Sequence, residues 1–264
     1  ALTEHRSAHW STFHGRGAPS LVLLLMCLSG LPLMSADVPG QDPAVLTGLT
    51  GGLIVQLGCA DIETPIALSQ TGRYLVHILG TSSAAVAEAR ARCRAGGYYG
   101  LVSVDRLGAS GRLPYVDSLV NLVILDGVTA RPSELFRIVA PMGAVFMRNS
   151  DPKARLELTQ AGFAVLPVDG TLLIARKPWP SGMDSWSHSR HAANGNAVSD
   201  DTLVAPPART RWIAGALSEV EGMVSAGGRN FYGGILARDG FNGLRLWHRD
   251  LGKAESNAAM FNLP

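Results

Sequence analysis

The feature that most constrains the fold is an apolar segment that ends in a turn of small residues. Residues 53–57 have the composition of a buried strand, and Gly58-Cys59-Ala60 follows at once. A second run, residues 119–125, is almost wholly apolar, as expected for a central strand covered on both faces. A buried strand leading straight into a tight turn indicates an α/β protein built on a parallel sheet.

Strand and helix patterns alternate up to about residue 178. A helix is predicted at 82–94, which is rich in Ala, has Ser near its N-cap and is stopped by Gly96-Gly97. A second helix is predicted at 132–139, with Pro in its first turn. Further strands are expected at 74–79, 101–104 and 144–147, followed by a hairpin of 163–168 and 172–176 around Asp169-Gly170. This order predicts a Rossmann-like sheet with an antiparallel edge pair.

The composition changes after Lys177. Pro178-Trp179-Pro180 is a break, and residues 181–201 are polar and lack periodicity. Short strand-like pieces follow at 210–213, 222–224, 230–232 and 234–237, and the stretch 236–247 reads Leu-Ala-Arg-Asp-Gly-Phe-Asn-Gly-Leu-Arg-Leu-Trp. A small β-rich segment is therefore expected after the α/β part.

Taken in order and spacing, several segments between residues 45 and 178 resemble a class I S-adenosylmethionine (SAM) methyltransferase domain. They are 55–61, Leu-Pro-Tyr at 113–115, 119–125, 134–143 and the closing hairpin region 162–178. The resemblance implies a Rossmann-like methyltransferase sheet with a C-terminal antiparallel hairpin, and SAM as a small nucleoside cofactor.

The stretch 236–247 resembles the repeat of quinoprotein-type (PQQ-like) β-propellers, in which a strand, an Asp, a Gly turn and a strand ending in Trp recur. One copy is present, with no period of about 40 residues, and a propeller needs several blades to close. The resemblance implies a partial blade and protein partners bound through a propeller. The expected organisation is a signal peptide at 1–36, a methyltransferase-like domain at 45–178, a linker at 179–209 and a partial PQQ-like repeat at 210–264.

The methyltransferase resemblance implies cofactor contacts at two turns. In the family, a turn of two glycines around one other residue lets the backbone approach the methionine part of SAM, because a Cβ there would clash. Gly58, Cys59 and Ala60 stand at this turn here, with Ala60 in place of the second glycine. Gly80 stands at the end of the second strand, where the family usually has an acid that holds the ribose hydroxyls. Losing such a carboxylate would cost about 1.5–3 kcal/mol, so SAM affinity could be weak or absent, with Thr81 as a partial substitute.

Two acids at strand ends complete the candidate cofactor-binding set. Asp105 follows the third strand, where the resemblance implies a residue facing the adenine. Asp126 ends the fourth strand at the edge where ligands bind in such sheets, so it could touch the methyl acceptor or equally cap a helix. Asp61 and Glu63 suit a helix N-terminus. Methyl transfer needs mainly positioning, so no catalytic residue is assigned.

Other classes of chemistry have little support. The net charge of +2 gives no reason to expect a nucleic-acid partner. Asp184-x-Trp186-x-His188-x-x-His191 has ligand types that zinc or copper accept, but a structural role is favoured and no metal is predicted. Cys59 and Cys93 are expected to be small buried hydrophobes, although the sequence leaves a disulfide open. Neither a Gly-x-Ser-x-Gly elbow nor a Gly-x4-Gly-Lys phosphate loop occurs.

The first residues have the pattern of a secretory signal. Arg6 and Arg16 precede the apolar run 21–33, and Leu33-Met34-Ser35-Ala36 offers a small-residue cleavage site. Gly30 and Pro32 make the run too short and broken for a stable membrane span. Export to the periplasm or medium is therefore predicted. The chain begins with Ala and ends inside a repeat, so it is expected to be a fragment.

Three hypotheses for function remain open. The first is a degenerate methyltransferase-like domain that serves as a binding or scaffold module beside a propeller. The second is an active SAM-dependent methyltransferase on an unknown acceptor. The third is part of a PQQ-dependent dehydrogenase-like protein. The combination of parts resembles large exported proteins of planctomycete-type bacteria.

Overall fold

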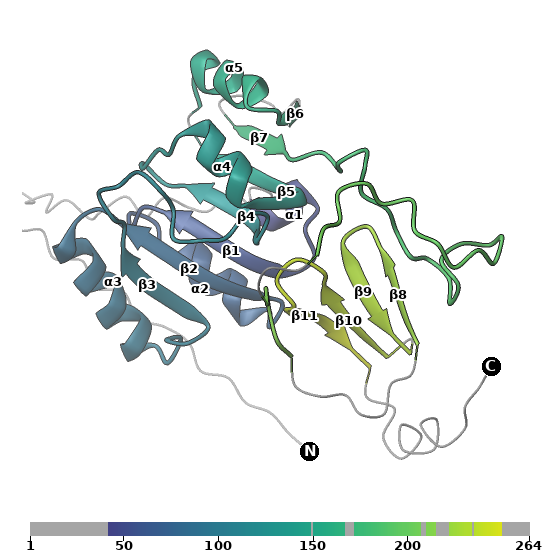
Figure 1. Cartoon of the computed structure of the whole chain (residues 1–264). Helices are drawn as coiled ribbons and strands as arrows, with labels where there is room; N and C mark the ends of the chain where they lie inside the picture. Colours follow the sequence, from purple (N-terminus) through teal and green to yellow (C-terminus); the bar gives the residue numbers. More distant parts are fainter. Residues whose placement is uncertain are drawn as a thin grey trace, which may run out of the picture. The chain divides into compact units, whose positions relative to one another are not determined.

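The computed structural model describes residues 42–148, 150–166, 172–206, 210–214, 222–233 and 235–249. Its main element is a seven-stranded sheet with the strand order β3-β2-β1-β4-β5-β7-β6 (Figure 1). The strands from β3 to β5 in this order pair in parallel, whereas β7 pairs antiparallel with both β5 and β6. The predicted Rossmann-like sheet with an antiparallel edge pair is thus confirmed.

The element bounds agree with most of the predicted ranges. The strands are β1 (Gly52–Leu57), β2 (Tyr74–Gly80), β3 (Val102–Arg106), β4 (Val120–Leu125), β5 (Val139–Met147), β6 (Ala164–Leu166) and β7 (Leu173–Arg176). The helices are α1 (Pro43–Thr47), α2 (Glu63–Gln70), α3 (Ser83–Ala95), α4 (Pro132–Ile138) and α5 (Pro152–Gln160). The turn predicted at Asp169-Gly170 and the signal peptide predicted at 1–36 lie outside the described residues.

Helices cover both faces of this sheet. Ile66 of α2 and Val86 of α3 belong to one buried cluster, and Leu135 of α4 and Leu158 of α5 belong to the other. Every residue of β1 and of β4 is buried. This two-sided burial is the reason that these strands are so apolar in sequence. None of the helices in the described part of the chain is long and apolar enough to cross a bilayer.

The fifth strand differs from its predicted range. Strand β5 begins at Val139, five residues before the expected start, and α4 ends at Ile138. Pro141 and Gly143 interrupt the apolar pattern, which is why the pattern alone placed the start too late. The backbone is irregular at this point, because Met142 has φ +65° and the register between β4 and β5 shifts.

The residues after 222 form a separate four-stranded antiparallel sheet. Its order is β11-β10-β9-β8, with β8 (Met223–Ala226), β9 (Arg229–Tyr232), β10 (Leu236–Asp239) and β11 (Arg245–His248). The strand predicted at 210–213 is wrong, because these residues pair with no strand of the described chain. Trp212 is held by its side chain instead, since its indole N–H donates to the carbonyl of Gly240 at 3.1 Å.

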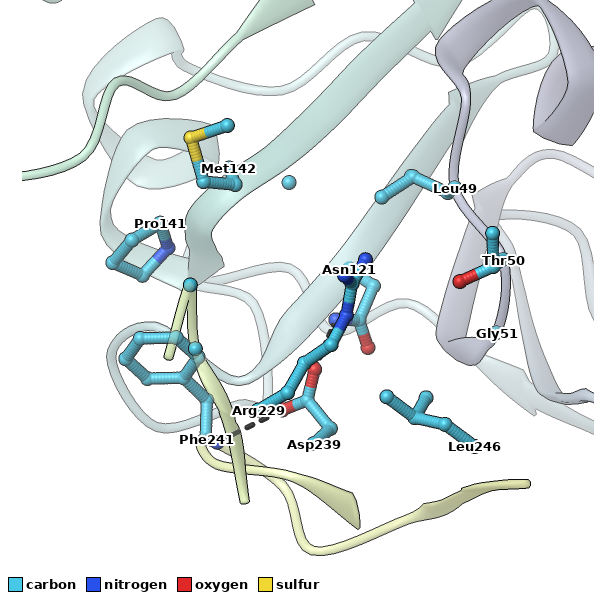
Figure 2. A pocket seen from close by; sticks show the side chains of 13 residues that line it. Leu49, Thr50, Gly51, Asn121, Pro141, Met142, Arg229, Asp239, Phe241 and Leu246 are labelled. Atoms are coloured by element: carbon cyan, nitrogen blue, oxygen red, sulfur yellow. Dashed lines mark hydrogen bonds between the residues drawn. The ribbon is translucent and has the colours of Figure 1, made fainter. Parts of the chain in front are cut away.

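A buried polar network joins the two sheets at the amino end of the parallel strands (Figure 2). The side-chain Oδ1 of Asn121 on β4 accepts from the Leu53 amide at 2.8 Å and from Asn242 Nδ2 at 2.7 Å. Its Nδ2 donates to Asp239 Oδ2 at 2.7 Å. The other Asp239 oxygen accepts from the amides of Phe241 and Asn242. Burial raises the pKa of the Asp239 carboxyl, and these hydrogen bonds oppose that effect.

Candidate functional site

The candidate cofactor site lies where β1, β2 and β4 end. Gly58 follows β1 with φ +119°, and its amide donates to the carbonyl of Leu79 at 2.9 Å. A Cβ at Gly58 would overlap the backbone carbonyl of Asp126. The structure therefore brings Gly58 and Asp126 into contact, and the fold itself requires glycine at this position.

Asp126 closes the turn that the resemblance assigns to SAM. Its Oδ2 accepts from the amides of Ala60 at 2.9 Å and Asp61 at 2.8 Å. The side-chain Nε2 of Gln56 lies 3.4 Å from the same oxygen. Asp126 thus holds the amides of the turn that precedes α2, which begins at Glu63, and its contact with a methyl acceptor stays a prediction. Asp61 in turn accepts from the Thr64 amide at 3.0 Å, and Glu63 lies in the first turn of α2, as the sequence predicted.

The space beside Gly80 is already filled. An ideal Cβ on Gly80 would lie 2.5 Å from Cys59 Sγ and 2.8 Å from Val86 Cγ2. Real Cβ atoms do not approach other atoms so closely, and the Val86 side chain is stiff because it is β-branched and on a helix. Burial, and next the charge of Asp126, raise the pKa of the Cys59 thiol. Cys59 is thus a packing residue here, and it forms no disulfide with the buried Cys93.

The remaining two predicted residues do not join this cluster by their side chains. Thr81 is exposed. Asp105 is bound by Arg90 and, at 3.1 Å, by His77 Nε2. His77 Nδ1 also lies 2.8 Å from the hydroxyl of Tyr115, whose pKa is raised by burial. The Asp105 carboxylate is therefore engaged within the β2–β3 side of the sheet.

One buried residue at this edge was not singled out from the sequence. Gln56 on β1 is fully buried, and its Nε2 donates to the carbonyl of Asp61, while its Oε1 has no hydrogen-bond donor among the described residues. A buried acceptor without a partner is uncommon. The available sequence signal was a polar side chain within an otherwise apolar strand.

These contacts test whether the edge suits SAM. Asp126 occupies the amides of Ala60 and Asp61, and Cys59 and Val86 fill the space in which an acid at position 80 would stand. The resident residues thus do not provide the acidic ribose contact that the resemblance implies at position 80. The arrangement therefore fits SAM poorly.

The polar cluster in residues 184–200 is a second candidate. Asp184, His191 and Asp200 bring potential ligand atoms within 4.8 Å of one another. However, the Asp184 carboxylate already accepts from the Asp200 and Ser185 amides, Ser199 Oγ and His191 Nε2, and these bonds lower its pKa. The Asp184 carboxylate therefore holds the loop together by these hydrogen bonds. The ring of Trp186 packs against that of His191 in a tilted geometry, with 5.2 Å between the ring centroids.

No family model matches the sequence, and no curated protein matches it. Among solved structures, the chain is similar to the [4+2]-cyclase SpnF, with 16% identity and a TM-score of 0.45 over 51% of this chain and 78% of that one. It is also similar to a putative S-adenosyl-L-methionine-dependent methyltransferase from Methanococcus maripaludis, with 12% identity and a TM-score of 0.45 over 52% and 82%. A SAM-dependent methyltransferase from Aquifex aeolicus shows 16% identity and a TM-score of 0.42 over 51% and 89%.

The capping role of Asp126 can be tested by stability. Asp126→Ala is expected to lower the free energy of unfolding by about 1–2 kcal/mol, because two amides lose their acceptor. Asp126→Asn keeps one oxygen that can receive both amides, and should lose less than half as much. Urea unfolding followed by circular dichroism gives both values. Equal losses in the two variants would contradict the capping role.

Proposed function

We propose that the chain carries a degenerate methyltransferase-like domain that does not use SAM and serves as a scaffold for the four-stranded sheet. The observation that carries this proposal is the space beside Gly80. Cys59 and Val86 fill it, so a ribose-binding acid at this position would need both neighbours to move. The fold is retained while the contact that implies cofactor binding is absent, and fold alone does not determine function.

The contacts at the amino end of the parallel strands support the scaffold part of the proposal. Asn121 on β4 connects the Leu53 amide to Asp239 and Asn242 of the small sheet. Asn121 is 8% exposed and Asp239 6% exposed, and the hydrogen bond between them joins Asn121 Nδ2 to the Asp239 oxygen that the loop amides leave open. Buried polar groups that satisfy one another fix one relative geometry, whereas apolar contacts alone tolerate several.

We also propose that the small sheet is a blade of a PQQ-like β-propeller, as the resemblance of residues 236–247 implies. A four-stranded antiparallel sheet is the repeating unit of a propeller, and β8 to β11 form such a unit in chain order. Export by a cleaved signal remains a prediction from the sequence.

The first experiment is isothermal titration calorimetry of the full chain with SAM and with S-adenosylhomocysteine. We expect no saturable heat from either ligand, with a cooperative thermal transition showing that the sample is folded. Micromolar binding of either ligand would contradict the proposal and would support an active methyltransferase, whose acceptor would then be sought.

A further inference from the structure

A cleft of about 540 Å³ opens at the carboxyl side of the sheet, and its lining includes none of the residues assigned to SAM. Its walls come from the β3–β4 connection, from the segment that leads into α4, and from α5. Figure 1 shows α4 and α5 beside the sheet. It is lined by Leu107, Gly111, Leu113, Thr129, Ala130, Arg131, Pro132, Asp151, Lys153, Ala154 and Glu157. This volume lies within the range of small-molecule pockets, and the carboxyl edge of a parallel sheet is where ligands bind.

We infer that this cleft binds a small molecule with an apolar body and one carboxylate, and that Arg131 holds the carboxylate. The inference does not rest on the proposed function, because none of the residues predicted to contact SAM lines the cleft.

The walls of the cleft are fixed to one another. Arg137 of α4 donates to the carbonyls of Leu113 at 3.2 Å and Tyr115 at 2.7 Å. Glu134 of the same helix accepts from the Leu113 amide at 2.7 Å and pairs with Arg137 at 2.6 Å, which lowers the pKa of the Glu134 carboxyl. The β3–β4 connection is therefore held against α4. A preformed cleft spares a ligand the entropy cost of ordering it.

The apolar part of the lining indicates the body of the ligand. Leu113 is buried, and Leu107, Ala130 and Pro132 are partly buried. These side chains offer no hydrogen bond, so they favour an aromatic or aliphatic group over a sugar.

The charges at the rim indicate its polar group. Asp151 is engaged, because its carboxylate accepts from the Ala154 amide at 2.6 Å. Lys153 is paired with Glu157, with 3.7 Å between Nζ and Oε1. The guanidinium of Arg131 is exposed and has no hydrogen bond or ion pair with any described residue. A guanidinium presents parallel donors that match the two oxygens of a carboxylate. Arg131 is thus the available cation at the mouth of an apolar cleft.

The test compares naphthalene-1-acetate with naphthalene-1-acetamide, which has the same rings and no charge. Dissociation constants for the full chain are measured by ligand-observed NMR titration. The acid is expected to bind about tenfold or more tightly than the amide. Arg131→Gln should remove this difference and leave the amide unchanged. Arg73→Gln removes the same charge from an exposed position that does not line the cleft, and should preserve the difference.

A second variant places the binding in the cleft. Ala130→Phe fills the apolar space and should abolish binding of both compounds while the thermal transition is retained. Equal affinity for acid and amide, an unchanged preference in Arg131→Gln, or binding that survives Ala130→Phe would each overturn the inference. So would failure of both compounds to bind the folded wild-type chain. None of these results depends on whether SAM binds.

Discussion

Replacing Asn121 by Asp should lower the free energy of unfolding by about 3 kcal/mol at neutral pH. The variant side chain has nearly the same shape, so packing is preserved. Its oxygens can still accept from Leu53 and Asn242, but Asp239 Oδ2 loses its donor. Two buried carboxylates then meet where an amide and a carboxylate met at 2.7 Å. Like charges so close cannot both stay ionised in a buried site.

The loss should depend on pH in a definite direction. Burial already raises the pKa of Asp239, and the added carboxylate would raise the pKa of the pair further. A carboxyl whose pKa is higher in the folded than in the unfolded protein makes its full contribution to stability below the unfolded pKa of about 4. This contribution is lost as the pH rises through the folded pKa. The difference from wild type should therefore shrink as the pH is lowered from 7 toward 4, in urea unfolding followed by tryptophan fluorescence.

The control is Asn196→Asp, the same change at an exposed position in the loop that follows β7. It should alter stability by less than about 0.5 kcal/mol at every pH. A loss in Asn121→Asp that is constant with pH would instead mean that disturbed packing, and not charge, is responsible.

Most of the parallel sheet could be predicted because strands that are buried on both faces consist of continuous apolar residues. The ranges of β1, β2 and β4 follow from apolar runs that end at Gly58, Gly80 and Asp126. The start of β5 could not be predicted in the same way, since the Met142 irregularity depends on pairing with β4 and β7.

The candidate site was predictable in location but not in contacts. Gly58, Cys59, Ala60, Gly80 and Asp126 do come together, because parallel strands end at one edge. That Cys59 fills the space beside Gly80 depends on the path of the turn, which no local pattern encodes. Asn121 offered one signal, as a polar residue in an otherwise apolar run, but its partners lie 118 and 121 residues away.

Gly58→Ala should be still more damaging, with a loss of about 3–5 kcal/mol in the free energy of unfolding. Two independent costs combine at this position. The backbone has φ +119°, which residues with a side chain rarely adopt, and the new Cβ would overlap the carbonyl oxygen of Asp126. Backbone atoms at the end of a buried strand cannot move aside as a flexible side chain would.

Gly72→Ala separates these two costs. Gly72 also has a positive φ, +71°, but no atom lies within 4 Å of an added Cβ. Its substitution should cost only the left-handed backbone strain, about 1–2 kcal/mol. Guanidinium unfolding of both variants, with unchanged slopes, gives the comparison, and equal losses would show that the contact with Asp126 contributes nothing. A much larger loss at Gly58 would mean that the glycine is required by the packing of β1 against the end of β4. Its presence would then be explained without any cofactor, which is the condition that a degenerate methyltransferase-like domain has to meet.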